Sequence, residues 1–239
     1  MYLFHSTREM LIEFLPKNGH LAEIGTAEGD FADHILKTAQ PSHLHLIDPW
    51  EHQAVDQYKT DSNNVTQEEA DRRYESVCNR FKDETDKGVV TIHRNYSTEA
   101  VKYFGDQQFD WIYVDGMHTE QAVAEDLRCF APKVKPGGFI CGHDYTNHAA
   151  AQRMKFGVIE AVNTFVRETS FEFIALTLEP FPTYVLSAEP NSALCQEFLT
   201  YATHGLDIAL AIDGFEDKNF SQTMAEFSDG KRKLISKLS

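Results

Sequence analysis

Residues 21–30 of the chain read Leu-Ala-Glu-Ile-Gly-Thr-Ala-Glu-Gly-Asp, a short apolar segment that runs into two closely spaced glycines. An apolar helical pattern follows, so this stretch predicts a strand, a glycine turn and a helix. Such a turn lets a ligand approach the backbone and points the N–H groups of the helix N-terminus toward it. Nucleotide-like cofactors are held in this way, so Gly25, Thr26 and Gly29 are candidate cofactor-binding residues.

Glu23 stands in the expected strand just before the glycine turn. It is an unusual residue to place beside a ligand that carries phosphate. Its carboxylate would repel a pyrophosphate, whereas it would attract a cationic ligand. Glu23 therefore favours a cofactor with positive charge near the turn.

The overall charge of the chain limits its partners. The 239 residues include 22 Lys and Arg against 37 Asp and Glu, which gives a formal net charge of −15. So acidic a chain repels phosphates, and we expect no nucleic-acid partner but a small-molecule acceptor. Hydrophobic residues make up 42% of the sequence, enough to bury the core of one α/β domain.

Cysteine usage and the lack of long apolar runs indicate a cytoplasmic protein. The N-terminus lacks the basic-then-apolar pattern of a signal peptide, and no apolar run approaches the ~20 residues of a membrane span. We therefore expect no membrane partner. The cysteines are scattered without a C-x-x-C pair and are expected to be reduced and buried: Cys78, Cys129, Cys141 and Cys195.

Apolar segments alternate with longer helical patterns, which is typical of βαβ units. The expected strands are 20–24, 43–47, 89–93, 110–114 and 138–142. The expected helices are 7–15, 29–38, 66–82, 97–104, 119–131 and 151–168. Two further strands, 171–178 and 183–187, are joined by so short a link that they should pair antiparallel. The pattern predicts an α/β, Rossmann-like doubly wound sheet of seven strands, mostly parallel, with a C-terminal antiparallel hairpin.

Two parts of the chain stand outside this core. Residues 51–68 are polar and follow the second strand, so they are expected to form an insertion or lid loop. Residues 190–239 are expected to form a C-terminal extension after the main domain, 1–189, with helices around 190–203 and 219–238. Apolar side chains of the extension can pack on the core or on a second subunit, which leaves a homo-oligomer open: Leu194, Phe198 and Tyr201.

Polar residues follow the fourth and fifth expected strands, at the edge where a doubly wound sheet binds ligands. Asp115 and His118 follow strand 110–114, and His143 and Asp144 follow strand 138–142. Two acids and two histidines at one edge indicate general-base chemistry or a metal site. The alternative for each one alone is a loop residue satisfied by the backbone.

Two more candidates stand at the ends of the second and third strands. Asp48 lies 23 residues beyond Gly25, about the spacing at which an acid accepts hydrogen bonds from ribose hydroxyls. A turn aspartate before Pro49 is the alternative. Ser97 can cap the following helix, contact an adenine edge, or do both.

Together these motifs resemble the class I S-adenosylmethionine-dependent methyltransferases. More narrowly, they resemble the small-molecule O-methyltransferase group that includes the macrocin and catechol O-methyltransferases. The resemblance covers about residues 5–188 and assigns the methyltransferase domain to 1–189. It rests on four segments: 22–29 (AEIGTAEG), 48–50 (DPW), 109–118 (FDWIYVDGMH) and 135–145 (KPGGFICGHDY).

The resemblance implies S-adenosyl-L-methionine as the cofactor and a role for each motif. Gly25 and Gly29 would let the cofactor approach, Asp48 would hold its ribose, and Ser97 would lie near its adenine. Glu23 would lie near the methionine moiety, whose sulfonium and ammonium groups explain a carboxylate at this position. Asp115 is also counted among the cofactor-binding residues.

Metal-dependent relatives in this group place magnesium between acids at the positions of Asp115 and Asp144. Their further ligand is adjacent to the second acid, where this chain has His143 and Tyr145 in place of Asp, Glu or Asn. Imidazole suits Zn, Fe or Ni better than Mg, so both the presence and the identity of a divalent metal stay open.

The function implied is transfer of a methyl group to a small-molecule hydroxyl, on a sugar or a phenol of secondary metabolism by analogy with the group. A metal at Asp115 and Asp144 would lower the pKa of that hydroxyl. Alternatively a histidine takes the proton directly, with His118 favoured as the base and His143 as a metal or supporting ligand. Two other functions stay open: an NAD(P)-dependent oxidoreductase, against which the G-x-x-x-G spacing argues, and a non-catalytic S-adenosylmethionine-binding protein.

Overall fold

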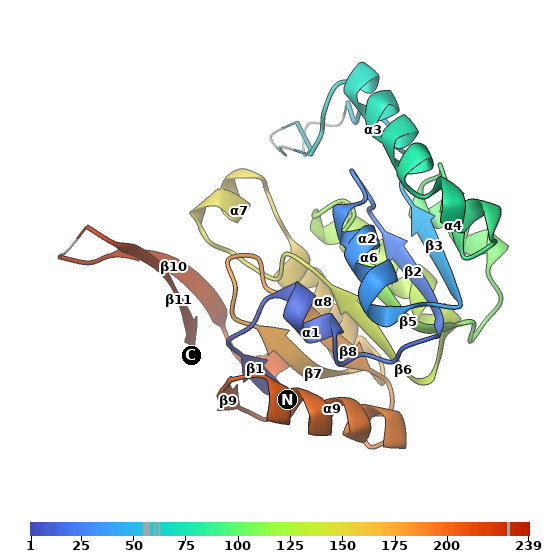
Figure 1. Ribbon diagram of the computed structural model, residues 1–239. Helices are drawn as coiled ribbons and strands as arrows, with labels where there is room; N and C mark the ends of the chain where they lie inside the picture. The colour runs from blue at the N-terminus through green and yellow to red at the C-terminus, as the bar shows by residue number, and fades with distance from the viewer. Residues whose placement is uncertain (55–57, 60, 62, 229) are drawn as a thin grey trace.

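A single nine-stranded sheet forms the centre of the computed structural model, which describes residues 1–54, 58, 59, 61, 63–228 and 230–239 (Figure 1). The strands lie in the order β4-β3-β2-β5-β6-β8-β7-β1-β9. Their bounds are β1 Tyr2–Phe4, β2 His20–Ile24, β3 His43–Ile47, β4 Val90–His93, β5 Phe109–Val114, β6 Val134–Gly142, β7 Glu172–Thr177, β8 Tyr184–Ser187 and β9 Ile208–Ala211.

The pairing of these strands confirms the predicted fold class. Neighbours from β4 to β6 are parallel, and β8 lies antiparallel between β6 and β7, which is the expected hairpin. Two further strands, β1 and β9, extend the sheet beyond the seven predicted. Strand β1 pairs parallel with β7 and antiparallel with β9, so a short N-terminal segment joins the tail to the sheet.

Helices cover both faces of the sheet. Alternate residues of β5 show this, because Trp111 and Tyr113 join one hydrophobic cluster while Ile112 and Val114 join the other. The helix bounds are α1 Arg8–Ile12, α2 Asp30–Ala39, α3 Gln67–Arg80, α4 Lys82–Asp86, α5 Ser97–Ala100, α6 Glu120–Phe130, α7 Ala149–Arg153, α8 Val158–Glu168 and α9 Ala193–Gly205. Short 3₁₀ turns follow α5 and α6 at Val101–Tyr103 and Ala131–Lys133, and a third spans Phe215–Asp217.

The turn between β2 and α2 depends on Gly25. Its φ is +91°, and a Cβ added there would lie 2.0 Å from the carbonyl oxygen of Asp115. The backbone N–H of Asp115 donates to the carbonyl of Ile24 at 2.7 Å, so the two segments lie in contact. Only glycine permits this close approach of the turn to the end of β5.

The predicted helix over 151–168 is wrong in its middle, where α7 ends and α8 begins. Gly157 donates its backbone N–H to the carbonyl of His118 at 2.9 Å, and a Cβ on Gly157 would lie 2.6 Å from the backbone of Glu120. This contact with the start of α6 interrupts the helix. Phe156 lies between the two helices and packs on the His118 ring, with ring centroids 4.3 Å apart.

The predicted helix over 219–238 is also wrong. Strands β10 Phe220–Glu226 and β11 Arg232–Leu238 pair antiparallel and form a two-stranded arm that projects from the body of the molecule (Figure 1). At its base Phe220 and Gln222 are buried and Ser221 between them is only half-buried, which follows the period of a strand. Farther from the base Met224, on the same face as Phe220, is 58% exposed. The helix expected around 190–203 is confirmed as α9.

The expectations for the cysteines, for membrane spans and for the loop 51–68 can also be compared with the structure. All four cysteines are free; Cys141 and Cys195 are buried, but Cys78 and Cys129 are only half-buried. Within the part of the chain that the structure describes, every helix is too short or too polar to span a lipid bilayer. The expected loop 51–68 ends at Thr66, which caps α3, and its residues 55–57, 60 and 62 lie outside the described residues.

Candidate active site

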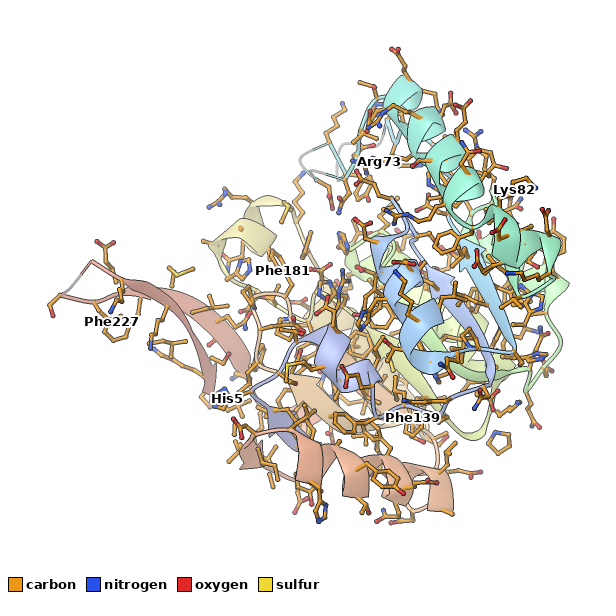
Figure 2. All side chains as sticks on the ribbon, viewed as in Figure 1. His5, Arg73, Lys82, Phe139, Phe181 and Phe227 are labelled. Atoms are coloured by element: carbon orange, nitrogen blue, oxygen red, sulfur yellow. The ribbon has the colours of Figure 1, made fainter. Side chains whose placement is uncertain are left out.

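The loops at the carboxyl ends of β2, β3, β4 and β5 surround a cavity of about 380 Å³. A second cavity, of about 460 Å³, lies next to it and opens toward α7. Both are lined by Gly25, Ala27 and Asp115, so they meet at the turn after β2 and the end of β5. Figure 2 shows Phe181 beside α7 and Arg73 on α3, two side chains that line the second cavity from opposite sides.

Asp48 lines the first cavity and fixes the glycine turn. Its two carboxylate oxygens accept the backbone N–H groups of Ala27 at 2.9 Å and Trp50 at 2.7 Å. The turn role expected before Pro49 is thus present. Each oxygen keeps a free lone pair on the cavity side of this arrangement, so Asp48 can also accept hydrogen bonds from a ligand.

Ser97 also lines the first cavity, but it does not cap the helix. Tyr96 occupies the N-cap position of α5, and the Ser97 hydroxyl donates instead to the carboxylate of Asp126. Asp126 is 5% exposed, and burial raises its pKa to about 7. Sequence reasoning missed Asp126, although an acid between Val123 and Leu127 on the apolar face of α6 was the available signal.

Glu23 and Thr26 line the second cavity with polar atoms that lack partners within the described chain. Glu23 is 1% exposed, and its Oε2 has no hydrogen bond. Burial, with the negative charge of Asp115, raises the pKa of Glu23 well above its usual range. The Thr26 hydroxyl is likewise buried and unpaired. A buried carboxyl without a partner is costly, so this position suits a cationic ligand.

Gly29 has a structural role in the turn, and its predicted contact with the cofactor stays a prediction. It lines neither of the two cavities described above. Its φ is +78°, and a Cβ there would lie 2.9 Å from the ring of Phe81. Gly29 therefore shapes the start of α2 and lets α3 pack against it.

Five residues form what we call the carboxylate–histidine cluster: Asp61, Asp115, His118, His143 and Asp144. His118 lies at its centre, with Nε2 2.9 Å from Asp144 Oδ2 and 3.7 Å from Asp115 Oδ1. Its Nδ1 lies 2.9 Å from Asp61 Oδ2. His143 Nδ1 lies 3.4 Å from Asp144 Oδ2 and 3.6 Å from Asp115 Oδ1.

The structure brings His118, rather than His143, into the group of residues that could hold a metal ion. One donor atom each from Asp115, His118 and Asp144 lie within 4.8 Å of one another, the spacing of a metal site. His118, predicted as the base, supplies the nitrogen of this group, whereas His143, predicted as a ligand, lies beside it. Asp144 holds a left-handed backbone conformation, φ +60°, which turns its carboxylate toward His118.

The charges of the cluster are mutually compensating. Burial alone would lower the pKa of His118, but the carboxylates of Asp144, Asp115 and Asp61 raise it well above its usual value. Burial would also lower the pKa of His143, but Asp115 and Asp144 raise it to about 9. In return the histidines lower the pKa values of Asp115 and Asp144 despite their burial. The carboxylates therefore favour the protonated form of both imidazoles.

Sequence reasoning missed two residues of this site. Arg8 donates from Nη1 to Asp115 Oδ2 at 2.8 Å, and its guanidinium stacks 4.2 Å from the Phe31 ring centroid. Asp61 belongs to the loop 51–68, which was predicted to be an insertion or lid loop, but no sequence motif distinguished Asp61 from the other polar residues of that loop. Their partners Asp115 and His118 are 107 and 57 residues away along the chain.

Comparison with known proteins agrees with this geometry. A family model described as a methyltransferase domain matches residues 22–145. No curated protein gives a significant match to the sequence.

Several solved structures are similar to this chain in fold. One is the N-methyltransferase NodS from Bradyrhizobium japonicum, at 14% identity and a TM-score of 0.51, over 74% of this chain and 90% of that one. Another is a Streptococcus mutans protein in complex with SAH, at 10% identity and a TM-score of 0.50, over 74% and 93%. A third is spermidine synthase from Thermotoga maritima, at 12% identity and a TM-score of 0.51, over 82% and 61%. At such identities the likeness shows the fold alone.

Proposed function

Because the chain belongs to the methyltransferase-domain family and is an S-adenosylmethionine-dependent methyltransferase, we propose that it methylates a small-molecule hydroxyl beside a divalent metal ion. One observation carries this proposal. His118 Nε2 is buried between Asp144 and Asp115, yet it forms no aligned hydrogen bond with any described atom. Once a metal ion displaces the Nε2 proton, the nitrogen lone pair and two carboxylates that face one point are the donors of a metal site.

The cofactor fits across the junction of the two cavities. Asp48 and the Ser97–Asp126 pair offer acceptors and donors for ribose and adenine in the first cavity, whose volume is within the usual range for ligands. The unpaired carboxyl of Glu23 lies on the other side of Gly25, where it suits the ammonium or sulfonium of the methionine part. Gly25 and Asp115, shared by both cavities, lie where the methyl group would face the acceptor.

The residues also fit a metal ion. Two donors at right angles on an ion with bonds of about 2.1 Å lie about 3 Å apart, close to the 2.9 Å between His118 Nε2 and Asp144 Oδ2. A set of one imidazole and two carboxylates suits Zn, Fe, Mn or Ni better than Mg. When bound, such an ion polarises a hydroxyl and lowers its pKa.

The second cavity has the character of a small acceptor site. Phe31, Phe156 and Phe181 supply apolar wall, and the charged side chains of Arg8, Glu23 and the carboxylate–histidine cluster line the cavity as well. A ring-shaped acceptor such as a phenol or a sugar can stack on such walls while it presents a hydroxyl to the cluster.

The test is a methyl-transfer assay with phenols, catechols and sugars, and with amine analogues of the same shape. We expect product from hydroxyl acceptors, loss of activity after chelation, and recovery with one divalent ion. Asp144→Ala should lose the response to metal. Asp106→Asn, which changes an exposed carboxylate before the start of β5, should behave as wild type. Full activity in the chelated wild type would remove the metal, and preference for amines would remove O-methylation.

A further inference from the structure

Asp61 is buried although it comes from a polar surface loop. The residue is 5% exposed, and its Oδ2 lies 2.9 Å from Nδ1 of His118, which is 6% exposed. Burying a carboxylate costs several kcal/mol unless a partner compensates it. The loop between β3 and α3 thus carries a charged side chain into the site for contact with one particular ring nitrogen.

The orientation of the Asp61 carboxylate is fixed from within its own loop. Its Oδ1 accepts the backbone N–H of Asn63 at 2.8 Å, which leaves Oδ2 to face His118. Asn64 then ties the loop together, because its side chain donates to the carbonyls of Gln53 and Tyr58 and accepts the N–H of Gln53. Both oxygens of the carboxylate therefore have defined partners.

We infer that Asp61 is a positioning residue, which holds the His118 ring so that Nε2 points at Asp115 and Asp144. A carboxylate on one imidazole nitrogen keeps the proton there and frees the other nitrogen as a ligand or proton carrier. The ring of Phe156, 4.3 Å away centroid to centroid, packs against the imidazole and restricts its rotation. The role in turnover rests on the proposed function, whereas the contact itself does not.

The same loop reaches the first cavity. Tyr58, Asn63 and Asn64 line that cavity, and Asp61 lines the second. Asp61 and residues that line the cofactor cavity thus lie on one short segment.

The experiment that tests this contact is proton NMR of the full chain labelled with ¹⁵N-histidine, with S-adenosylhomocysteine bound. We expect a downfield, slowly exchanging Nδ1–H resonance, assigned to His118 by its loss in His118→Gln. The resonance should disappear in Asp61→Ala and persist, shifted, in Asp61→Asn, whose side-chain oxygen still accepts. Glu68→Ala, which removes an exposed carboxylate from the start of α3, should leave the resonance unchanged.

Kinetics then separate positioning from a merely structural role. Loss of a residue that orients a ligand or a base typically costs 10–100-fold, so Asp61→Ala should lower kcat by about that factor with KM for the cofactor within about twofold. Asp61→Asn should recover part of the loss. The inference is overturned if the resonance is absent from the wild type or survives in Asp61→Ala, or if KM alone changes. The NMR result needs no acceptor, so it stands apart from any failure of the proposed reaction.

Discussion

Individual buried polar side chains set the chemistry at this edge of the sheet. Glu23 and His118 each keep a buried polar atom without an aligned partner in the described chain, and both line the second cavity. Asp126 instead has a partner, Ser97, but is forced by burial to hold its proton near neutral pH. A bound ligand can compensate the cost of such groups, so they are typical of functional sites.

Asp126 should make the stability of the protein depend on pH. Burial raises its pKa from 3.8 to about 7, so its contribution is fully present below about pH 4 and is lost as the pH rises through 7. One proton gives a slope of at most about 1.4 kcal/mol per pH unit. Urea unfolding should show a smaller fall in the free energy of unfolding between pH 5 and 8 for Asp126→Asn than for wild type. An equal fall in both proteins would assign the dependence elsewhere.

Asp48 should matter for cofactor affinity. Asp48→Ala removes a carboxylate that holds the N–H groups of Ala27 and Trp50 and faces the cavity. Hydrogen bonds to a charged group contribute about 1.5–3 kcal/mol, so calorimetry should show the Kd for S-adenosylhomocysteine raised at least about tenfold. Asp86→Ala, whose carboxylate is 62% exposed, serves as the control and should bind as wild type. Unchanged affinity in Asp48→Ala would show that the residue serves the turn alone.

At the scale of elements, a site residue could be predicted from the sequence where it follows a predictable strand. Asp115 and Asp144 were predictable because they end parallel strands, and parallel strands bring their carboxyl ends to one edge. Arg8 was not, because α1 lies before the first predicted strand and reaches Asp115 only through tertiary packing. The break between α7 and α8 depends on a contact of Gly157 with α6, and the arm at β10 and β11 on burial at its base, neither of which a local pattern contains.

The β2–α2 turn should tolerate no side chain at Gly25. Gly25→Ala places a Cβ 2.0 Å from the Asp115 carbonyl oxygen at a φ of +91°, so we expect several kcal/mol of destabilisation or failure to fold. Gly88→Ala is the matched control, because φ is +73° but nothing lies within 4 Å. It should cost only about 1–2 kcal/mol, a fall in Tm of a few degrees. Similar melting temperatures for the two variants would contradict the steric argument.

At the scale of the whole molecule, the projecting arm contacts the loop after β6, which carries part of the candidate active site. Its base is buried beside the loop that follows β6, where Phe220 packs 5.5 Å from the Tyr145 ring, centroid to centroid (Figure 1). Gln222 accepts a hydrogen bond from Thr146 and donates to the carbonyl of Glu179 at 2.9 Å. The last strands of the chain therefore hold the segment that carries Asp144.

Gln222→Ala should weaken both the fold and the site. It removes the acceptor of the buried Thr146 hydroxyl and a donor to the Glu179 carbonyl, at a cost of about 0.5–1.5 kcal/mol each, and it loosens a loop two residues from Asp144. Urea unfolding should show that loss, and titration with a divalent ion should show weaker binding. Met224→Ala, 58% exposed on the same strand, should change stability by no more than about 0.5 kcal/mol. The ion titration decides whether the arm also supports the loop that carries Asp144. If Gln222→Ala loses stability but binds the ion as wild type does, the arm stabilises the fold without supporting that loop.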